Sequence, residues 1–216
     1  MRTSPTDAVR ELYEDTADSY AQMMDAEIDL PVYADVLGRL RERISNTPGP
    51  IVDSACGSGH MLALYHSHFD QRRSLLGVDL SPPMASIAQS KLGSSAQVAV
   101  GDMRDLSAIA SNSASAVLNF FALHHLDPKG VVVALREWFR LLAPGGHLVV
   151  ATWEGSGAID YGDQSDIVAV RYGSSDLAGW AKQAGFSVLR CAVEPVEDFA
   201  MDAVYLEAVK GGELCE

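Results

Sequence analysis

The stretch Ile51-Val52-Asp53-Ser54-Ala55-Cys56-Gly57-Ser58-Gly59-His60 decides the fold. An apolar run leads into an acid and then into two glycines, which predicts a strand, a tight turn and the start of a helix. Glycine at positions 57 and 59 permits a sharp turn and removes the Cβ atoms that would hold a flat ligand away from the backbone. Asp53 places a carboxylate in the same crevice. These features together indicate a nucleotide-like ligand.

Strands and helices alternate along the rest of the chain in the order typical of a parallel α/β sheet. The apolar runs predict parallel strands at residues 50–54, 75–79, 96–100, 115–121 and 147–153. The segments between them predict helices near residues 60–68, 83–92 and 129–142. Two last strands, near 186–193 and 201–209, form a predicted hairpin. We therefore expect a Rossmann-like, doubly wound α/β sheet of seven strands, mostly parallel with an antiparallel C-terminal hairpin.

Side chains that can cap helices set the expected helix starts. Ser81 and Asp127 each stand directly before a proline, a combination that favours the start of a helix. Thr6 is the expected cap of a short helix over residues 6–14. Ser174 or Ser175 is the expected cap of a helix that runs to residue 184.

Size and composition favour one domain, residues 1–216. The apolar fraction of 48% and the charged fraction of 21% are ordinary for a globular chain of this length. Residues 1–46 are the expected N-terminal helical cover, and residues 47–216 the cofactor-binding α/β core. No stretch approaches the ~18 apolar residues of a membrane span, and the N-terminus lacks the apolar core of a secretory signal. We expect a cytoplasmic protein with no membrane partner.

Charge and cysteine content narrow the expected partners. The formal net charge is −13, so a nucleic acid would meet a repulsive field. Cys56, Cys191 and Cys215 lack the spacing of a disulfide framework or of a zinc site. We expect a small-molecule substrate, no nucleic acid and no metal, and either a monomer or a homodimer.

Two residues bear on the kind of nucleotide-like ligand. Leu62 stands where a dinucleotide-binding turn has its third glycine, which allows close helix packing around a pyrophosphate. Asp53 would repel a phosphate but can accept from an ammonium or a ribose hydroxyl. S-adenosylmethionine meets both demands, because it carries adenosine and an amine but no phosphate.

The opening stretch resembles the first motif of class I S-adenosylmethionine-dependent methyltransferases of the small-molecule type, in the superfamily that includes ubiquinone and menaquinone methyltransferases. Segments similar to the later motifs follow in the family's order, at residues 76–81, 100–103, 118–125 and 142–148. The likeness covers about residues 50–153. It implies S-adenosyl-L-methionine as cofactor and S-adenosyl-L-homocysteine as product.

The resemblance implies roles for residues at the strand ends. Asp79 would accept from both ribose hydroxyls, and Asp102 from the adenine amino group, with Met103 against the ring. Ala55 departs from the family's commonest pattern, which has glycine there. Residues 13–20 resemble an N-terminal pattern of methyltransferases whose leading helices fold over the cofactor. The expected cofactor contacts are Tyr20, Asp53, Ala55, Gly57, Gly59, Asp79, Leu80, Asp102, Met103 and Asn119.

The methyl acceptor is expected beside the loop from residue 154 to residue 172. His124 is the candidate general base, because histidine can take a proton near neutral pH, and its alternative role is to shape the pocket floor. The expected substrate contacts are Met24, His124, Trp153, Tyr161, Arg171 and Tyr172.

The predicted function is transfer of a methyl group, by in-line displacement, to an O, N, S or C nucleophile of a small molecule. The alternatives are a methyltransferase that acts on protein or RNA, and a cofactor-binding module without catalysis. A nicotinamide oxidoreductase is a third possibility, which Leu62 and Asp53 disfavour.

Overall fold

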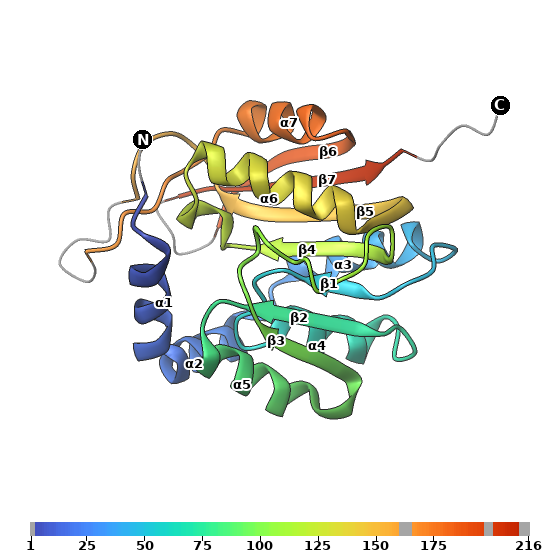
Figure 1. Cartoon of the computed structure of the whole chain (residues 1–216), viewed down its shortest axis with the longest axis horizontal. Coiled ribbons are helices and arrows are strands. Elements are labelled where there is room, and N and C mark those ends of the chain that lie inside the picture. The colour runs from blue at the N-terminus through green and yellow to red at the C-terminus, as the bar shows by residue number, and fades with distance from the viewer. Residues whose placement is uncertain (1–2, 160–165, 197–200, 212–216) are drawn as a thin grey trace.

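The computed structural model describes residues 3–159, 166–196 and 201–211. Its centre is one seven-stranded sheet in the order β3-β2-β1-β4-β5-β7-β6 (Figure 1). The strands are β1 (Ile51–Asp53), β2 (Leu75–Asp79), β3 (Ala96–Val100), β4 (Ala114–Phe120), β5 (Leu142–Trp153), β6 (Phe186–Glu194) and β7 (Ala203–Lys210).

Strand directions confirm the predicted fold class. The strands from β3 through β5 pair in parallel, whereas β7 pairs antiparallel with both β5 and β6. The chain runs outward from β1 to β3 and then returns to β4 on the other side of β1. Such a reversal opens a crevice at the carboxyl ends of β1 and β4, where doubly wound sheets bind ligands.

Helices cover both faces of the sheet and pack on two apolar cores. One core joins the sheet to α3 (Pro31–Arg43), α4 (His60–His68) and α5 (Pro82–Leu92). The other joins it to α6 (Pro128–Leu141) and α7 (Ser174–Gln183), with Trp138 fully buried. Of the two short 3-10 turns, η1 (Gly93–Ser95) has no buried residue, whereas all three residues of η2 (Leu123–His125) are buried.

Two of the expected caps are confirmed and two are wrong. Ser81 and Asp127 accept hydrogen bonds from the backbone N–H three residues on, at 3.4 and 2.8 Å. The first helix begins at Thr6 itself, because Pro5 takes the flanking position, and α7 begins at Ser174 after a glycine. Thr6 and Ser174 therefore lie inside their helices, and neither helix has a side-chain cap.

The N-terminal helices α1 (Thr6–Asp15) and α2 (Ala17–Glu27) lie at the carboxyl end of the sheet (Figure 1). The segment before α1 is fixed to the chain beyond β5. Ser4 N donates to Val168 O at 3.0 Å, and Val168 N donates to Ser4 Oγ at 2.8 Å. These contacts hold the start of α1 in place, whereas α3, which also belongs to the predicted cover of residues 1–46, packs on a face of the sheet.

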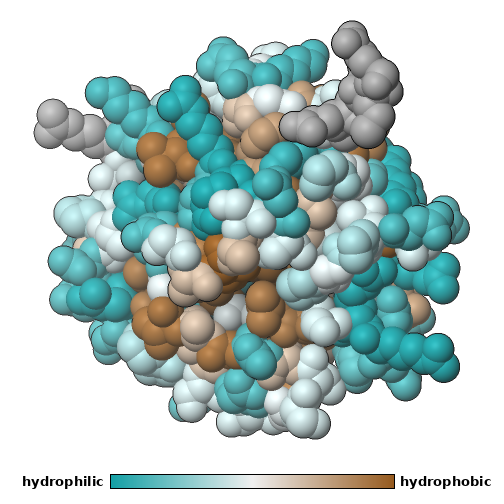
Figure 2. Space-filling model, turned by 45° about the vertical axis from the view of Figure 1, so that its right-hand side comes forward, coloured by the Kyte–Doolittle hydropathy of each residue, from teal (hydrophilic) through white to brown (hydrophobic). Residues whose placement is uncertain are grey.

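The surface is mostly polar, and Figure 2 shows apolar residues in small groups on the face it presents. Among the described residues, no helix has both the length and the apolar character needed to cross a bilayer.

Substitution of Glu207 on β7 tests how α3 is held against the sheet. It is 2% exposed and accepts hydrogen bonds from Arg39 at 2.7 Å and from Arg43. Replacing Glu207 with Ala leaves the arginines without their acceptor. We expect the free energy of unfolding to fall by about 2–3 kcal/mol, the lower part of the range for broken buried ion pairs, since both arginines keep some contact with water.

Chemical denaturation of Glu207→Ala measures this loss. Asp25→Ala, which breaks a more exposed ion pair with Lys91 away from Glu207, serves as the control and should cost less than about 1 kcal/mol. Equal losses in the two variants would contradict a structural role for the Glu207 cluster.

Candidate functional site at the carboxyl edge of the sheet

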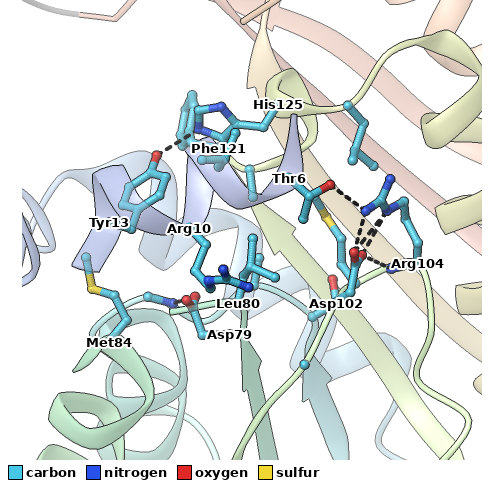
Figure 3. A pocket seen from close by; sticks show the side chains of 18 of the residues that line it. Thr6, Arg10, Tyr13, Asp79, Leu80, Met84, Asp102, Arg104, Phe121 and His125 are labelled. Carbon is cyan, nitrogen blue, oxygen red and sulfur yellow. Dashed lines mark hydrogen bonds and ion pairs between the residues drawn. The ribbon is translucent and has the colours of Figure 1, made fainter. Parts of the chain in front are cut away.

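A cavity lies at the carboxyl ends of β1 to β4 and beneath α1. It holds about 720 Å³ of space between atoms, open solvent at its mouth included. Its wall combines the turn after β1, the ends of β2, β3 and β4, and residues of α1 and α2. Figure 3 shows the side chains of these elements around it.

The turn after β1 forms the floor of the cavity, and it depends on its two glycines. Gly57 and Gly59 have φ angles of 51° and 81°, in the left-handed region that glycine adopts easily. A Cβ on Gly57 would lie 3.3 Å from the ring of Tyr20, which also lines the cavity. Gly59 does not line it. A Cβ there would lie 3.1 Å from Ala88, so Gly59 allows α4 and α5 to pack closely.

Asp79, at the end of β2, presents a carboxylate to the cavity next to Leu80. Its Oδ2 accepts from Gly57 N at 2.7 Å and its Oδ1 from Ser81 N at 2.9 Å. Burial raises the pKa of Asp79, and these backbone N–H groups act in the opposite direction. Each oxygen keeps a lone pair, so the carboxylate can accept from two further donors.

Asp102, after β3, lines the same cavity beside Met103 and is paired with Arg104. Arg104 Nε donates to both carboxylate oxygens, at 2.9 and 3.1 Å, and its backbone N–H donates to Oδ1 at 2.9 Å. Burial alone would raise the pKa of Asp102, but Arg104 holds it below its usual range. Arg104 Nη2 also donates to Thr6 Oγ1 at 2.8 Å, which joins this acid to α1 (Figure 3).

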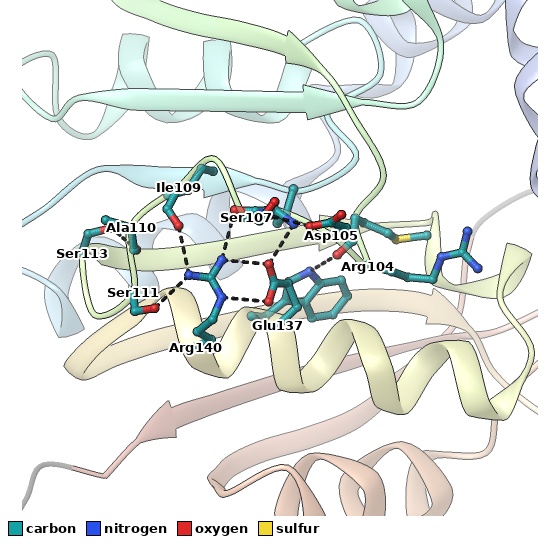
Figure 4. Close-up of polar contacts among 12 residues, drawn as sticks. Arg104, Asp105, Ser107, Ile109, Ala110, Ser111, Ser113, Glu137 and Arg140 are labelled. Carbon is teal, nitrogen blue, oxygen red and sulfur yellow. Dashed lines mark hydrogen bonds and ion pairs between the residues drawn. The ribbon is translucent and has the colours of Figure 1, made fainter.

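Contacts with α6 position the loop that carries Asp102 (Figure 4). Trp138 Nε1 donates to Met103 O at 3.2 Å, and Leu106 N donates to Glu137 Oε1 at 2.8 Å. Arg140 pairs with Glu137 and donates to the carbonyl oxygens of Leu106 and Ile109 at 3.0 Å. The loop after β3 is therefore held by side chains of α6.

Asp53 and Asn119 lie below the cavity wall and do not line it. Asp53 is 2% exposed, and burial and the nearby Asp79 raise its pKa to about 7. Asn119 is fully buried, and its Nδ2 donates to Ser54 Oγ at 3.1 Å. Their neighbours Ser54 and Ala55 do line the cavity, so contacts of Asp53 and Asn119 with a ligand remain predictions.

Tyr13 and His125 face each other at the end of the cavity away from the acids (Figure 3). Tyr13 Oη lies 2.9 Å from His125 Nε2. His124, the predicted base, is 4% exposed and lies outside the lining, with its ring 4.1 Å from the ring of His125. Both histidines of the doublet are candidate bases by sequence, and His124 was preferred because it is nearer the strand end, yet it is His125 that lines the cavity. Thr6, Arg10, Tyr13, Arg104 and Phe121 also line the cavity without having been predicted.

The other predicted substrate contacts lie around the cavity, not in its wall. Trp153 packs on Phe121 with ring centroids 4.8 Å apart. Met24 is 6% exposed, and buried Tyr172 donates its hydroxyl to Leu126 O. Arg171 donates to Ser156 O at 2.9 Å. Tyr161 lies outside the described residues.

Comparison with known proteins agrees with this geometry. The methyltransferase domain family matches residues 51–146. An uncharacterised methyltransferase of Bacillus mycoides is 28% identical over 136 residues, which are 63% of this chain and 61% of the length of that relative. The chain therefore matches less than two thirds of this curated relative.

Solved structures share the fold. One is the 1,6-didemethyltoxoflavin-N1-methyltransferase of Burkholderia thailandensis with bound 1,6-didemethyltoxoflavin and S-adenosylhomocysteine. It has a TM-score of 0.73 at 20% identity, over 96% of this chain and 91% of that one. Another is the methyltransferase in a complex with the Haloferax volcanii Trm112 activator, with a TM-score of 0.71 at 18% identity, over 92% of this chain and 97% of that one.

Residues 51–146 are therefore similar to a methyltransferase domain, and the fold is that of S-adenosylmethionine-dependent methyltransferases. This similarity agrees with the family that the sequence motifs predicted. The lining of the cavity fits the family's cofactor. Asp79 can accept from hydroxyl groups, Asp102 can accept from an amino group that displaces a hydrogen bond from Arg104, and Gly57 leaves space where a Cβ would stand. The arginines of the described lining, Arg10 and Arg104, are both paired with acids, which does not suit a pyrophosphate.

Asp79→Ala tests the ribose-binding role in this methyltransferase. The variant loses a charged acceptor, so the affinity for S-adenosylhomocysteine should fall by roughly 1.5–3 kcal/mol. Calorimetry measures the affinity, with Asp35→Ala, an exposed acid of α3, as the control. Unchanged affinity in the Asp79 variant would remove this residue from the ribose site.

Arg104→Ala tests whether Arg104 competes with a ligand for Asp102. The hydrogen bonds from Arg104 fill the acceptor positions of the carboxylate, so an adenine amine must displace one of them. S-adenosylhomocysteine should bind the variant more tightly, by about 0.5–1.5 kcal/mol. S-inosylhomocysteine, which lacks the amino group, should show no such gain. Equal weakening of both ligands would mean that Arg104 supports the adenine site directly.

Proposed function

We propose that this protein binds S-adenosylmethionine across the cavity and methylates a small molecule that enters beside His125. One observation carries the proposal: a single cavity joins Asp79 and Asp102, suited to adenosine, to a separate end lined by Tyr13, Phe121 and His125. The cofactor and the methyl acceptor can therefore meet in one enclosed space.

Each part of the chain has a role in this function. When bound, S-adenosylmethionine supplies an electrophilic methyl group on a positively charged sulfur. Asp79 accepts from the ribose hydroxyls and Asp102 from the adenine amino group. Asp53 is proposed to attract the ammonium group of the methionine end, with Asn119 beside it. Tyr20 covers the turn at Gly57.

The roof formed by α1 excludes water and holds the acceptor in place. Thr6, Val9, Arg10 and Tyr13 of this helix line the cavity. Holding the acceptor about 3 Å from the methyl carbon and in line with the departing sulfur can supply much of the rate acceleration. A dedicated base is needed only for an acceptor that arrives protonated.

A small acceptor suits a cavity that lies beneath α1, and it suits the acidic chain. The formal net charge of −13 opposes nucleic acid. The Burkholderia structure with this fold holds a small heterocycle, and the Haloferax structure holds an activator protein. A protein or RNA substrate would have to reach the methyl group past α1. If the protein instead methylates protein or RNA, or binds the cofactor without transferring its methyl group, the test below gives a different result.

Calorimetry and a transfer assay test this function together. The protein should bind S-adenosylmethionine and S-adenosylhomocysteine and should not bind NADH. With labelled S-adenosylmethionine, label should pass to a low-molecular-weight fraction of cell extract and not to its protein or RNA. Tight binding of NADH alone would contradict the cofactor, and label confined to protein or RNA would contradict the substrate class.

A further inference from the structure

The side chains at the Tyr13 and His125 end of the cavity favour one class of methyl acceptor. We infer that the acceptor is a planar aromatic molecule with an ionisable O–H or ring N–H, which stacks on Phe121 and loses its proton through Tyr13 to His125. This inference rests on the proposed function, because it assigns the substrate class and the proton path of the same site.

Phe121 provides a fixed flat surface for such a ring. It follows β4 with a φ of 50°, which is rare for a residue other than glycine and requires support from its surroundings. Its backbone N–H donates to Ala151 O at 2.8 Å. Its ring packs on Trp153 of β5 at 4.8 Å and edge-on against Tyr205 of β7 at 6.5 Å. An aromatic acceptor gains favourable ring packing on this surface.

The same end of the cavity has no charged side chain among the described residues of its lining. Tyr13, Phe121 and His125 form it, and in Figure 3 they lie apart from Asp102 and Arg104. In Figure 3 the guanidinium of Arg10 points toward Asp79 and Leu80, and its charge is paired with Asp7 and Glu14. A carboxylate or an ammonium acceptor would lose its hydration here without gaining a counterion. An uncharged acceptor is therefore favoured.

His125 can accept a proton through Tyr13. The two rings meet edge to face, 5.5 Å apart, and Tyr13 Oη lies 2.9 Å from Nε2. Burial lowers the pKa of His125 to about 4, so its imidazole is neutral at neutral pH and holds an added proton only weakly. The titratable groups that face it are Tyr13 from α1 and His124 from its own turn, and burial lowers the pKa of His124 as well. The ring of His124 therefore carries no positive charge near neutral pH.

The proposed step conserves atoms and charge. A lone pair of the acceptor oxygen or nitrogen forms a bond to the methyl carbon while the carbon–sulfur bond breaks and leaves its electron pair on sulfur. The acceptor proton passes to Tyr13 Oη, and the proton of Tyr13 passes to His125 Nε2. Tyr13 ends unchanged, and the imidazolium of His125 releases its proton to water after the methylated product leaves.

The path from the acceptor to His125 exists only while α1 is in place, because Tyr13 belongs to that helix. Thr6 accepts from Arg104 at one end of α1, and Tyr13 contacts His125 near the other. The proton path therefore depends on the contacts that hold α1 over the cavity.

Binding of matched probes to the protein loaded with S-adenosylhomocysteine tests the acceptor class without turnover. We expect 2-naphthol and 4-hydroxyquinoline to bind at least about 10-fold more tightly than decahydro-2-naphthol, which has a similar skeleton but no aromatic ring. Phe121→Leu should remove this preference and leave the affinity for S-adenosylhomocysteine unchanged. Equal binding of the saturated alcohol, or no binding of the aromatic probes, would contradict the assigned class.

Methylation of the same aromatic probes tests the proton path. Tyr13→Phe keeps the ring and removes the hydroxyl, so kcat should fall by about 10²-fold at neutral pH with little change in KM. Raising the pH until the probe ionises should restore the rate, which a merely structural defect would not do. His125→Gln should behave alike, and Tyr65→Phe, which removes a buried hydroxyl of α4 outside the cavity, is the matched control.

Full kcat in Tyr13→Phe across the pH range would contradict the path, as would binding of the aromatic probes by the wild-type protein without turnover. Failure of the wild-type protein to bind S-adenosylhomocysteine would instead refute the proposed function itself. Measuring that affinity first therefore separates the two failures.

Discussion

The hydrogen bond from Gly57 N–H to the carboxylate of Asp79, at 2.7 Å, is the contact on which the site depends. It fixes the turn after β1 against the end of β2, so two neighbouring strand ends act as one rigid wall. The bond requires the left-handed backbone at Gly57, and the missing Cβ leaves room for Tyr20 to close over the turn. Without this contact the acid at the end of β2 would have no defined position relative to the glycine turn.

The cavity built on this wall is electrically asymmetric. At one end Asp79 and Asp102 lie beside polar backbone, and at the other Phe121 and His125 form an uncharged wall. The roof helix α1 spans both, because Thr6 contacts the pair of Asp102 and Arg104 while Tyr13 contacts His125. One helix can therefore respond to the occupancy of both ends, which suits a site that must hold two molecules before reaction.

The sequence predicted the sheet well because each strand carries strong local signals. Parallel strands are buried on both faces and form apolar runs, and glycine or proline marks their ends. The resemblance to the family's later motifs assigned Asp79 and Asp102 to the crevice, and both acids do line the cavity. Position in the motif predicted a cofactor contact for Gly59. In the structure the missing Cβ of this glycine allows α4 to pack closely on α5.

The acceptor end could not be predicted in the same way, because it depends on contacts between distant segments. Which of two adjacent histidines faces the cavity is set by the single turn η2, and the partner of His125 lies 112 residues away on α1. The pairing of Arg104 with Asp102 is local, yet it follows from a turn geometry that Asp-Met-Arg alone does not specify. Such details arise from packing and not from propensity.

The burial of Asp53 lowers the stability of the fold near neutral pH. Its pKa is about 7 in the folded chain, above the ordinary value of an aspartate, so folding disfavours its charged form. Stability from this group is therefore lost as the pH rises from the ordinary aspartate pKa towards about 7. A buried carboxylate without a positively charged partner does not stabilise the fold. A positively charged ligand group next to Asp53 would lower its pKa again and restore the lost stability, so ligand binding and folding favour each other at this position.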